Sequence, residues 1–176
     1  MAGLAHAPPH DERVIDQTAA LIERLAAQGS TLAVAESLTG GALTAELIRI
    51  PGASAVVRGG IVAYATELKA TLLGVDATLL AEHGPVHPEV AIAMAQGARS
   101  AAMIEGIPAD LGVATTGVAG PDPQEGAPVG LVYVAVADAR GATVRELRLD
   151  GDRASLRAQS VDAAIALLQE HLSSRE

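Results

Sequence analysis

Short apolar runs alternate with amphipathic stretches along most of the chain. A continuous apolar run of about four to eight residues indicates a buried strand, whereas apolar residues recurring at helical spacing indicate a helix. These patterns predict strands at residues 31–35, 54–65, 110–117, 130–138 and 142–150. They predict helices at residues 12–28, 42–50, 66–74, 76–84, 88–106 and 155–172. Strands and helices interleaved in this order imply an α/β fold, in which helices cover both faces of a central sheet in three α-β-α layers.

Glycine and proline mark the boundaries of these elements. Pro88 suits the first position of a helix, because its fixed φ is helical and an N–H there would have no helical partner. Gly59 and Gly60 interrupt the stretch 54–65, which is therefore one long strand with a bulge or a pair of strands. Residues 1–11 contain two adjacent prolines, so we expect a loose tail ahead of one domain at 12–176.

Composition narrows the possible functions. With 176 residues, 49% of them hydrophobic, the chain can bury the core of one domain, and this core is aliphatic because Phe and Trp are absent. The absence of cysteine excludes disulfides, a thiolate nucleophile and cysteine metal ligands. The net charge of −9 argues against a nucleic-acid partner. No apolar run reaches the roughly 18 residues of a membrane span, and we expect a cytoplasmic protein without a membrane partner.

The segment 36–41, "ESLTGG", joins a predicted strand to a predicted helix. Backbone N–H groups at the start of a helix lack helical partners, so they stabilise an anion or a developing oxyanion. Gly40 and Gly41 would allow a ligand to approach the backbone closely. The alternative is structural, because Ser37 or Thr39 is equally suited to cap the helix.

The segment "GGIVAYATELK" places Tyr64 just after a predicted strand and Lys69 about one turn into the next helix. A lysine acts as a base only where burial or neighbouring positive charge lowers its pKa from about 10.4. The alternative is a solvated lysine on a helix surface. A short-chain dehydrogenase is excluded, because its tyrosine and lysine are separated by three residues instead of four and no G-x-G-x-x-G follows the first strand.

Two further segments have the residue types of a ligand pocket. A predicted strand ends in Thr116 and Gly117, and the loop that follows is rich in Gly and Pro, which is a usual place for a substrate pocket. In "GDRASLR", Arg153 lies near a helix start and could bind a phosphate bidentately, or it is simply solvated.

A metal site is not expected. His83 and His87 are four residues apart, which is a metal-ligand interval on a helix. However, Gly84 and Pro85 lie between them and would break that helix.

The segments "ESLTGG", "GGIVAYATELK", "LLGV", "EHGPV", "TTGVAGP", "PVGLVYVAVAD" and "GDR", in this order, resemble the CinA C-terminal domain family over roughly residues 12–174. Stand-alone members are nicotinamide mononucleotide (NMN) deamidases. The resemblance therefore implies an amidohydrolase that converts NMN and water into nicotinic acid mononucleotide and ammonia in pyridine nucleotide salvage, without metal or cofactor. The serine of the family's S-x-T-G-G motif and the tyrosine and lysine of its Y-x-x-x-x-K segment match Ser37, Tyr64 and Lys69.

The resemblance also implies substrate-binding residues. It places Thr116 and Gly117 against the nicotinamide and Arg153 near the phosphate. The residues themselves agree with amide hydrolysis, because serine paired with lysine is an activated nucleophile, and Tyr64 could relay a proton or orient the lysine. The N–H groups from Thr39 to Gly41 are candidates for either the oxyanion site or the phosphate site.

Three departures from the family pattern leave the substrate open. Thr66 replaces a usual asparagine, His87 replaces a usual serine before Pro88, and the loop "DPQEG" is more acidic than usual. Two alternatives therefore remain: a binding or regulatory module without activity, and a serine–lysine amidase for another small amide. A domain of this size and composition often pairs, so we also expect a homodimer.

Overall fold

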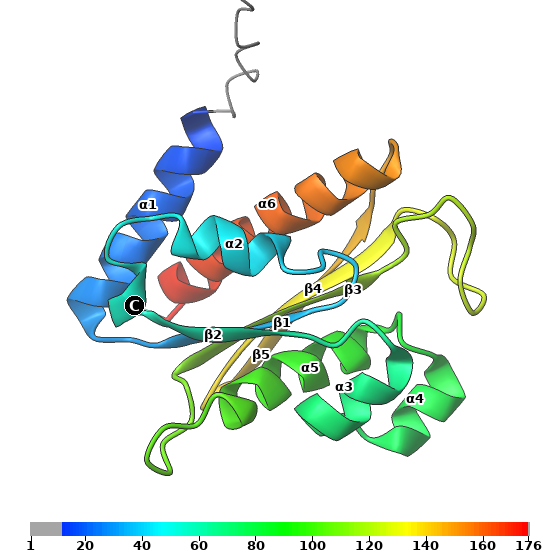
Figure 1. The fold of residues 1–176 in the computed structure, drawn as a ribbon, viewed down its shortest axis with the longest axis horizontal. Helices are drawn as coiled ribbons and strands as arrows, with labels where there is room; N and C mark the ends of the chain where they lie inside the picture. Colours follow the sequence, from blue (N-terminus) through cyan, green and yellow to red (C-terminus); the bar gives the residue numbers. More distant parts are fainter. Residues whose placement is uncertain (1–11, 176) are drawn as a thin grey trace, which may run out of the picture.

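A five-stranded sheet lies between two layers of helices in the computed structural model, which describes residues 12–175 (Figure 1). The strands are β1 (Leu32–Glu36), β2 (Val57–Val62), β3 (Leu111–Gly117), β4 (Leu131–Asp138) and β5 (Gly141–Arg148). Their order across the sheet is β2-β1-β3-β4-β5. Strands β1, β2 and β3 are parallel, whereas β4 and β5 each run antiparallel to the preceding strand. The predicted α/β fold with three α-β-α layers is confirmed.

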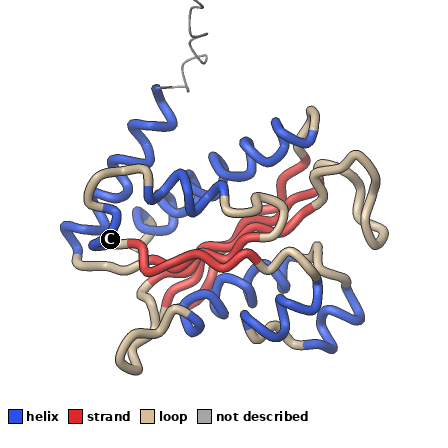
Figure 2. The backbone as a smooth tube through the Cα atoms, viewed as in Figure 1, coloured by secondary structure: helices blue, strands red, loops and turns tan. Residues whose placement is uncertain are grey.

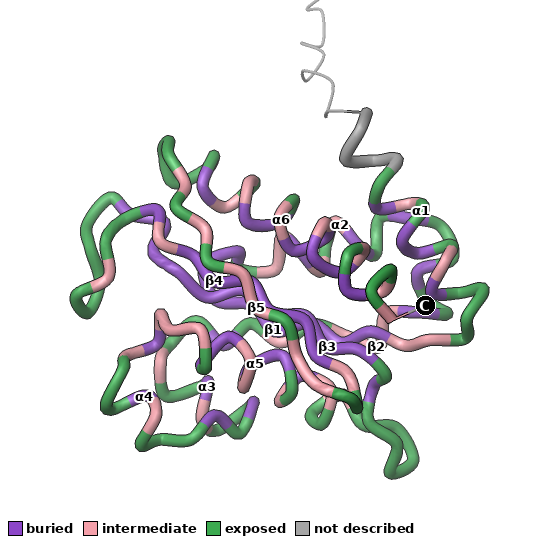
Figure 3. Tube along the Cα trace, turned by 180° about the vertical axis from the view of Figure 1, so that it is seen from behind, coloured by how far each residue is buried: buried purple, intermediate pink, exposed green. Residues whose placement is uncertain are grey.

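The helices divide between the two faces of the sheet, as Figures 1 and 2 show. One face is covered by α1 (Glu12–Gln28), α2 (Ala42–Ile48) and α6 (Arg153–Ser173). The other is covered by α3 (Thr66–Leu73), α4 (Ala77–His83) and α5 (Pro88–Ala101). Strands β1 and β3 are buried at every position, and the interior of the sheet is correspondingly purple in Figure 3. No helix among residues 12–175 is both long and apolar enough to span a membrane.

The two faces of the sheet differ in side-chain size. Along β1, Leu32 and Val34 enter the core beneath α1, α2 and α6, whereas Ala33 and Ala35 enter the core that contains α5. The small side chains bring α5 very close to the sheet, and a Cβ at Gly112 of β3 would lie only 1.9 Å from a backbone oxygen of α5. Helix α3 packs on α5 just as closely, because a Cβ at Gly97 would lie 1.9 Å from the Leu73 carbonyl oxygen. The position of α3 therefore depends on glycine and alanine.

Several predicted elements end within about two residues of their predicted limits, and two differ more. The stretch 54–65 contains only β2, which follows a short 3-10 helix at Ala53–Ala55. The pairing of β2 with β1 is irregular at Arg58 and not at Gly59 and Gly60, because Leu32 pairs with Val57 and the next residue, Ala33, pairs with Gly59. Gly60 has a packing role, since a Cβ there would lie 2.0 Å from the Thr44 hydroxyl of α2.

Helix α5 ends at Ala101, five residues before the predicted end at 106. Glu105 and Gly106 both have left-handed φ values, 52° and 81°, which form a tight turn between Ile104 and Ile107. This turn reverses the chain toward β3, so the helix cannot continue through it. The predicted tail at residues 1–11 lies outside the described residues.

Candidate active site

The segments that follow β1, β2 and β3 meet at one end of the sheet, because the carboxyl ends of parallel neighbouring strands lie together. Ser37 follows β1, Tyr64 follows β2, and Thr116 and Gly117 end β3. Arg153 starts α6, which approaches the same end of the sheet (Figure 1). The sequence-predicted residues therefore come from four separate segments of the chain.

Glu36 fixes the loop that carries Ser37. Its carboxylate is fully buried and accepts hydrogen bonds from the N–H groups of Gly41, Leu43 and Thr44 at 2.9, 3.1 and 2.8 Å. It also accepts the Thr44 hydroxyl at 2.6 Å. The start of α2 is thus capped by a charged group from the preceding strand, and the Ser37 hydroxyl is left for another partner.

That partner is Lys69. It lies in the second turn of α3, only 1% exposed, and its Nζ donates to Ser37 Oγ at 3.1 Å and to the Ala63 carbonyl oxygen at 2.9 Å. Burial lowers the pKa of Lys69 to about 8, although the carboxylates of Glu125 and Glu67 act in the opposite direction. Both hydrogen-bond partners are neutral, so the lysine can lose its proton without breaking an ion pair. The structure brings the predicted serine and lysine together.

The rarity of lysine in this chain also distinguishes Lys69, a feature that no motif expresses. Lys69 is the single lysine of the chain, and the other eleven of its twelve Lys and Arg residues are arginines. Arginine stays protonated in proteins, whereas lysine readily shifts its pKa when buried. The one lysine of the chain is therefore at a buried position, where the pKa of a lysine, unlike that of an arginine, can fall enough for the side chain to lose its proton.

Tyr64 and Arg153 form the rim of the site. Tyr64 is 58% exposed, and its hydroxyl accepts a hydrogen bond from Arg153 Nη2 at 2.9 Å. Arg153 Nη1 also donates to the Gly120 carbonyl oxygen at 2.7 Å. The phenol is therefore held by the arginine, and the pair links the segments after β2 and β3 to the start of α6.

A pocket opens between these groups. Its lining includes Ser37, Leu38, Tyr64, Thr66, Lys69, Pro85, Thr116, Gly117, Asp122, Gln124 and Arg153. Thr116 is buried, and its hydroxyl donates to the Pro85 carbonyl oxygen at 2.7 Å. Gly117 packs against Leu131 and Val132, where a Cβ would lie about 2.7 Å from their atoms. Both residues line the pocket, and the Thr116 hydroxyl already has a hydrogen-bond partner within the protein.

Thr39, Gly40 and Gly41 do not line this pocket. Thr39 is fully buried, and its hydroxyl lies 2.8 Å from that of Thr115. The Gly40 N–H donates to the Ser37 carbonyl oxygen at 3.1 Å, and the Gly41 N–H donates to Glu36. Two of the N–H groups considered for the oxyanion or the phosphate are therefore used to hold the loop.

Arg157 is a neighbour of the site that the motifs did not single out. Its Nε donates to the Leu38 carbonyl oxygen at 3.0 Å, and its Nη2 donates to the Thr39 carbonyl oxygen at 2.7 Å. Arg157 follows Arg153 by four residues, and because α6 begins at Arg153 this spacing places both side chains on one helix face. The four-residue spacing from Arg153 is the feature of the sequence that indicates Arg157 as a neighbour of the site.

His83 and His87 have a different arrangement. Their rings stack with centroids 4.4 Å apart, and His87 Nδ1 accepts the Glu89 N–H at 3.4 Å, which caps α5. The residue that replaces the family's serine thus still caps the helix. Among the side chains of residues 17–175, no group of three or more His, Asp or Glu is placed to bind a metal ion.

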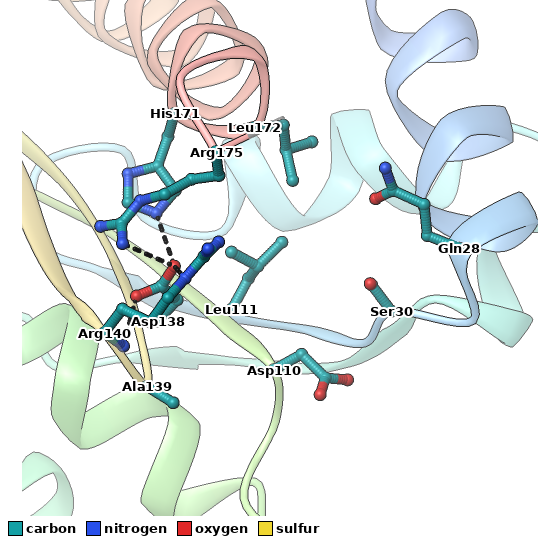
Figure 4. A pocket seen from close by; sticks show the side chains of 10 residues that line it. All are labelled: Gln28, Ser30, Asp110, Leu111, Asp138, Ala139, Arg140, His171, Leu172 and Arg175. Atoms are coloured by element: carbon teal, nitrogen blue, oxygen red, sulfur yellow. Dashed lines mark hydrogen bonds and ion pairs between the residues drawn. The ribbon is translucent and has the colours of Figure 1, made fainter.

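A second cavity, of about 290 Å³, lies at the opposite end of the strands (Figure 4). Asp138 lines one side of it, with His171 Nε2 at 3.3 Å and Arg175 Nη1 at 3.5 Å from its carboxylate. The same carboxylate accepts the N–H groups of Arg140 and Gly141. This cluster attaches the end of α6 to the turn between β4 and β5, and its polar groups bind one another.

Comparison with known proteins gives a consistent picture. The chain matches the family model described as "CinA C-terminal domain" over residues 15–172. A CinA-like protein of Frankia casuarinae is 50% identical over 149 residues, which are 85% of this chain and 33% of that protein. The chain spans between a third and two fifths of the length of the curated relatives it matches.

Solved structures match over nearly their whole length. The competence/damage inducible protein CihA from Agrobacterium tumefaciens has a TM-score of 0.83 and 32% identity, covering 94% of this chain and 98% of that one. A CinA superfamily protein from Klebsiella pneumoniae has a TM-score of 0.85 and 33% identity, covering 92% and 98%. The names of these proteins state no substrate.

Proposed function

The chain belongs to the CinA C-terminal domain family, and from this premise we propose that it is an amidohydrolase that deamidates NMN. The products are nicotinic acid mononucleotide and ammonia, and the place of the reaction is pyridine nucleotide salvage. The observation that carries the proposal is the 3.1 Å hydrogen bond between the buried Lys69 amine and the Ser37 hydroxyl. The deamidase activity comes from the family resemblance, and the serine–lysine pair supplies chemistry that fits it.

The proposed mechanism begins with neutral Lys69. Its amine accepts the Ser37 proton while the serine oxygen attacks the carboxamide carbon, which gives a tetrahedral oxyanion. The lysine ammonium then donates that proton to the departing nitrogen, so ammonia leaves and an ester to Ser37 remains. Water, activated by the same lysine, hydrolyses the ester and frees the carboxylate product. The bond to the Ala63 carbonyl oxygen keeps the amine in place through these steps.

The rim residues have supporting roles in this proposal. Tyr64, held by Arg153, lies beside the pocket mouth and assists in orienting the ligand or relaying a proton. Arg153 is the cation available to a phosphate, and it would exchange its bond to the Gly120 carbonyl for one to the ligand. Thr116 and Gly117 would lie against the nicotinamide ring.

An amidase for an uncharged or unphosphorylated amide is the second candidate. Asp122 lines the pocket, and a carboxylate there repels a phosphate. The Arg153 guanidinium also has two hydrogen-bond partners within the protein already. Both observations favour a smaller amide over a nucleotide, so the substrate assay must include both.

The experiment measures ammonia release from NMN by the wild type and by Ser37→Ala, Lys69→Ala and the double variant. Each single variant is expected to lose activity by about 10³-fold or more, and the double variant to be little worse, because residues that act as a unit are not additive. Circular dichroism verifies folding. Near-normal turnover by folded Ser37→Ala would remove serine as the nucleophile, and an inactive wild type would favour a binding module.

A further inference from the structure

Two successive peptide carbonyls after Ser37 point at one guanidinium. Arg157 Nε and Nη2 reach the carbonyl oxygens of Leu38 and Thr39 at 3.0 and 2.7 Å, from a partly buried position on α6. Gly40 leaves room for this contact, since a Cβ there would lie 3.5 Å from Arg157 Nη2. No acidic side chain among residues 17–175 forms a salt bridge with Arg157. Its positive charge therefore acts on the loop that follows the nucleophile.

The direction of the carbonyls determines the direction of the N–H groups. In a planar trans peptide the C=O and N–H bonds point to opposite sides. The Leu38 carbonyl points to α6, so the Thr39 N–H points away from α6. Lys69 comes from α3, on the other face of the sheet, and it contacts the Ser37 hydroxyl from there. The Thr39 N–H is thus directed toward the side on which the serine reacts.

The two N–H groups nearest to Ser37 are also free. In the part of the chain that the structure describes, the N–H groups of Leu38 and Thr39 have no hydrogen-bond acceptor. By contrast, the N–H groups of Gly40 and Gly41 are used within the loop. Leu38 lines the pocket directly. Free N–H groups beside a nucleophile are the donors that a tetrahedral oxyanion requires.

We propose that Arg157 is the positioning residue of the oxyanion site: it holds the peptide between Leu38 and Thr39 so that the Thr39 N–H, beside the free Leu38 N–H, faces the oxyanion formed when Ser37 attacks. This inference rests on the proposed amidohydrolase function. The guanidinium also polarises the Leu38 carbonyl, which makes the Thr39 N–H of the same peptide a stronger donor. Arg157 itself touches neither the substrate nor the reacting atoms.

The test compares Arg157→Gln and Arg157→Lys with a matched control, Arg145→Gln. Arg145 also binds α6, through Glu170, about 20 Å along the helix from Arg157. For Arg157→Gln we expect kcat for NMN to fall about 10- to 100-fold, because loss of one oxyanion donor costs about 10²- to 10³-fold and this change misdirects donors without deleting them. KM should stay within about threefold, and the pH at which activity rises should not move, because Lys69 is untouched.

The control variant should keep wild-type kcat. Unchanged kcat in Arg157→Gln, an equal loss in Arg145→Gln, or a change in KM alone would overturn the proposal. If Arg157→Gln melts well below the wild type, Arg157→Lys decides, since an ammonium can bind only one carbonyl well. A partial loss of kcat at wild-type melting temperature supports the proposal, and full activity overturns it.

A second readout separates this inference from the choice of substrate. A fluorophosphonate or a sulfonyl fluoride reacts with an activated serine, and the oxyanion site accelerates that reaction whatever the natural substrate is. The rate of labelling at Ser37 is followed by intact mass. Slower labelling of Arg157→Gln than of wild type and Arg145→Gln supports the proposal even if NMN is not hydrolysed. Equal rates in all three proteins overturn it.

Discussion

At the scale of single residues, the proposed mechanism depends on the protonation state of Lys69. Only the neutral amine can accept the serine proton. Because the pKa of Lys69 is about 8, the neutral form predominates above about pH 8. Water exclusion maintains this state, since the side chain is 1% exposed and bonded to two neutral oxygens. A surface lysine would need a far higher pH for the same fraction of neutral amine.

The first prediction concerns pH. For the wild type, kcat/KM for NMN should increase with pH and level off above about 8, where Lys69 is neutral. Glu125 raises the pKa of Lys69, so Glu125→Gln should lower that pKa and shift the rising part of the profile to lower pH. Because the chain has one lysine, biosynthetic labelling with ¹³C,¹⁵N-lysine gives a single labelled side chain whose NMR titration checks the assignment. A profile that moves to higher pH in Glu125→Gln would contradict this prediction.

The second prediction concerns the phosphate. If Arg153 binds it, nicotinamide riboside should show a kcat/KM at least about 10²-fold below that of NMN, because a charge-assisted contact would be missing. Arg153→Gln should lower kcat/KM for NMN and leave that for the riboside nearly unchanged. Equal kcat/KM for the two substrates in the wild type would instead favour an amidase for unphosphorylated amides, as the position of Asp122 suggests.

At the scale of elements, the catalytic geometry depends on how closely helices pack. Lys69 lies on α3, and α3 contacts α5 where Gly97 meets the Leu73 carbonyl. The distance between Lys69 and Ser37 is therefore set partly by a residue that is not in the site. A displacement of about 1 Å between reacting groups can reduce a rate by about 10²-fold.

The third prediction follows from this contact. Gly97→Ala should displace α3, lower the free energy of unfolding by about 1–3 kcal/mol and reduce kcat, because the new methyl group has no room. Gly59→Ala is the matched control, since a Cβ there meets no atom within 4 Å. Urea unfolding and NMN assays on both variants test this expectation. A fully active, fully stable Gly97→Ala would show that α3 is not held at this point.

The sequence predicts some elements much better than others. Apolar runs identify β1 and β3 because both strands are buried at every position. The convergence of Ser37 and Lys69 follows from parallel strands whose carboxyl ends share one edge. The end of α5 was predicted too late, because the turn at Glu105 and Gly106 gives only a weak local signal.

Long-range contacts explain why other parts of the site were not predicted. Arg157 contacts Leu38 across 119 positions, and no local pattern encodes such a pairing. The role of Glu36 was missed for another reason. Its carboxylate accepts hydrogen bonds from N–H groups five to eight residues later in the chain. These N–H groups, at the start of a helix, would otherwise be available to a ligand.

At the scale of the whole molecule, the two ends of the sheet have different tasks. The end with Ser37 holds a buried base, and the opposite end holds the cluster around His171 and Asp138 (Figure 4). Burial lowers the pKa of His171, and this effect exceeds that of the nearby Asp138, which raises it. Arg140 and Arg175 also face the ring and lower its pKa. The imidazole is therefore neutral in the folded protein near pH 7.

The fourth prediction is that acid destabilises the protein in two stages. In the unfolded chain His171 takes up a proton below about pH 6.5, whereas in the folded protein it does so only at lower pH, so stability should fall as pH drops below about 6.5. Burial acts to raise the pKa of Asp138, but its hydrogen bonds and Arg175 lower that pKa by more than burial raises it. A second loss of stability should therefore follow at more acidic pH. Urea unfolding between pH 8 and about 2 measures both stages.

His171→Gln distinguishes the two stages, since glutamine does not titrate. The variant should lose the first stage and keep the second, and its kcat at pH 8 should match the wild type because the cluster lies at the far end of the sheet. Wild-type protein that gains stability on acidification from pH 7 to 5.5 would disprove the assignment.

The position of Arg153 and Arg157 on the last helix has a consequence for protein synthesis. Chains emerge from the ribosome from the N-terminus at about 5–20 residues per second, and early segments begin to fold first. Ser37 and Lys69 are therefore exposed to the cell well before α6 is available to hold the Leu38 and Thr39 carbonyls. Under the proposed mechanism, a nascent chain would have Ser37 and Lys69 without a shaped loop, and activity would arise only once the last helix has been made.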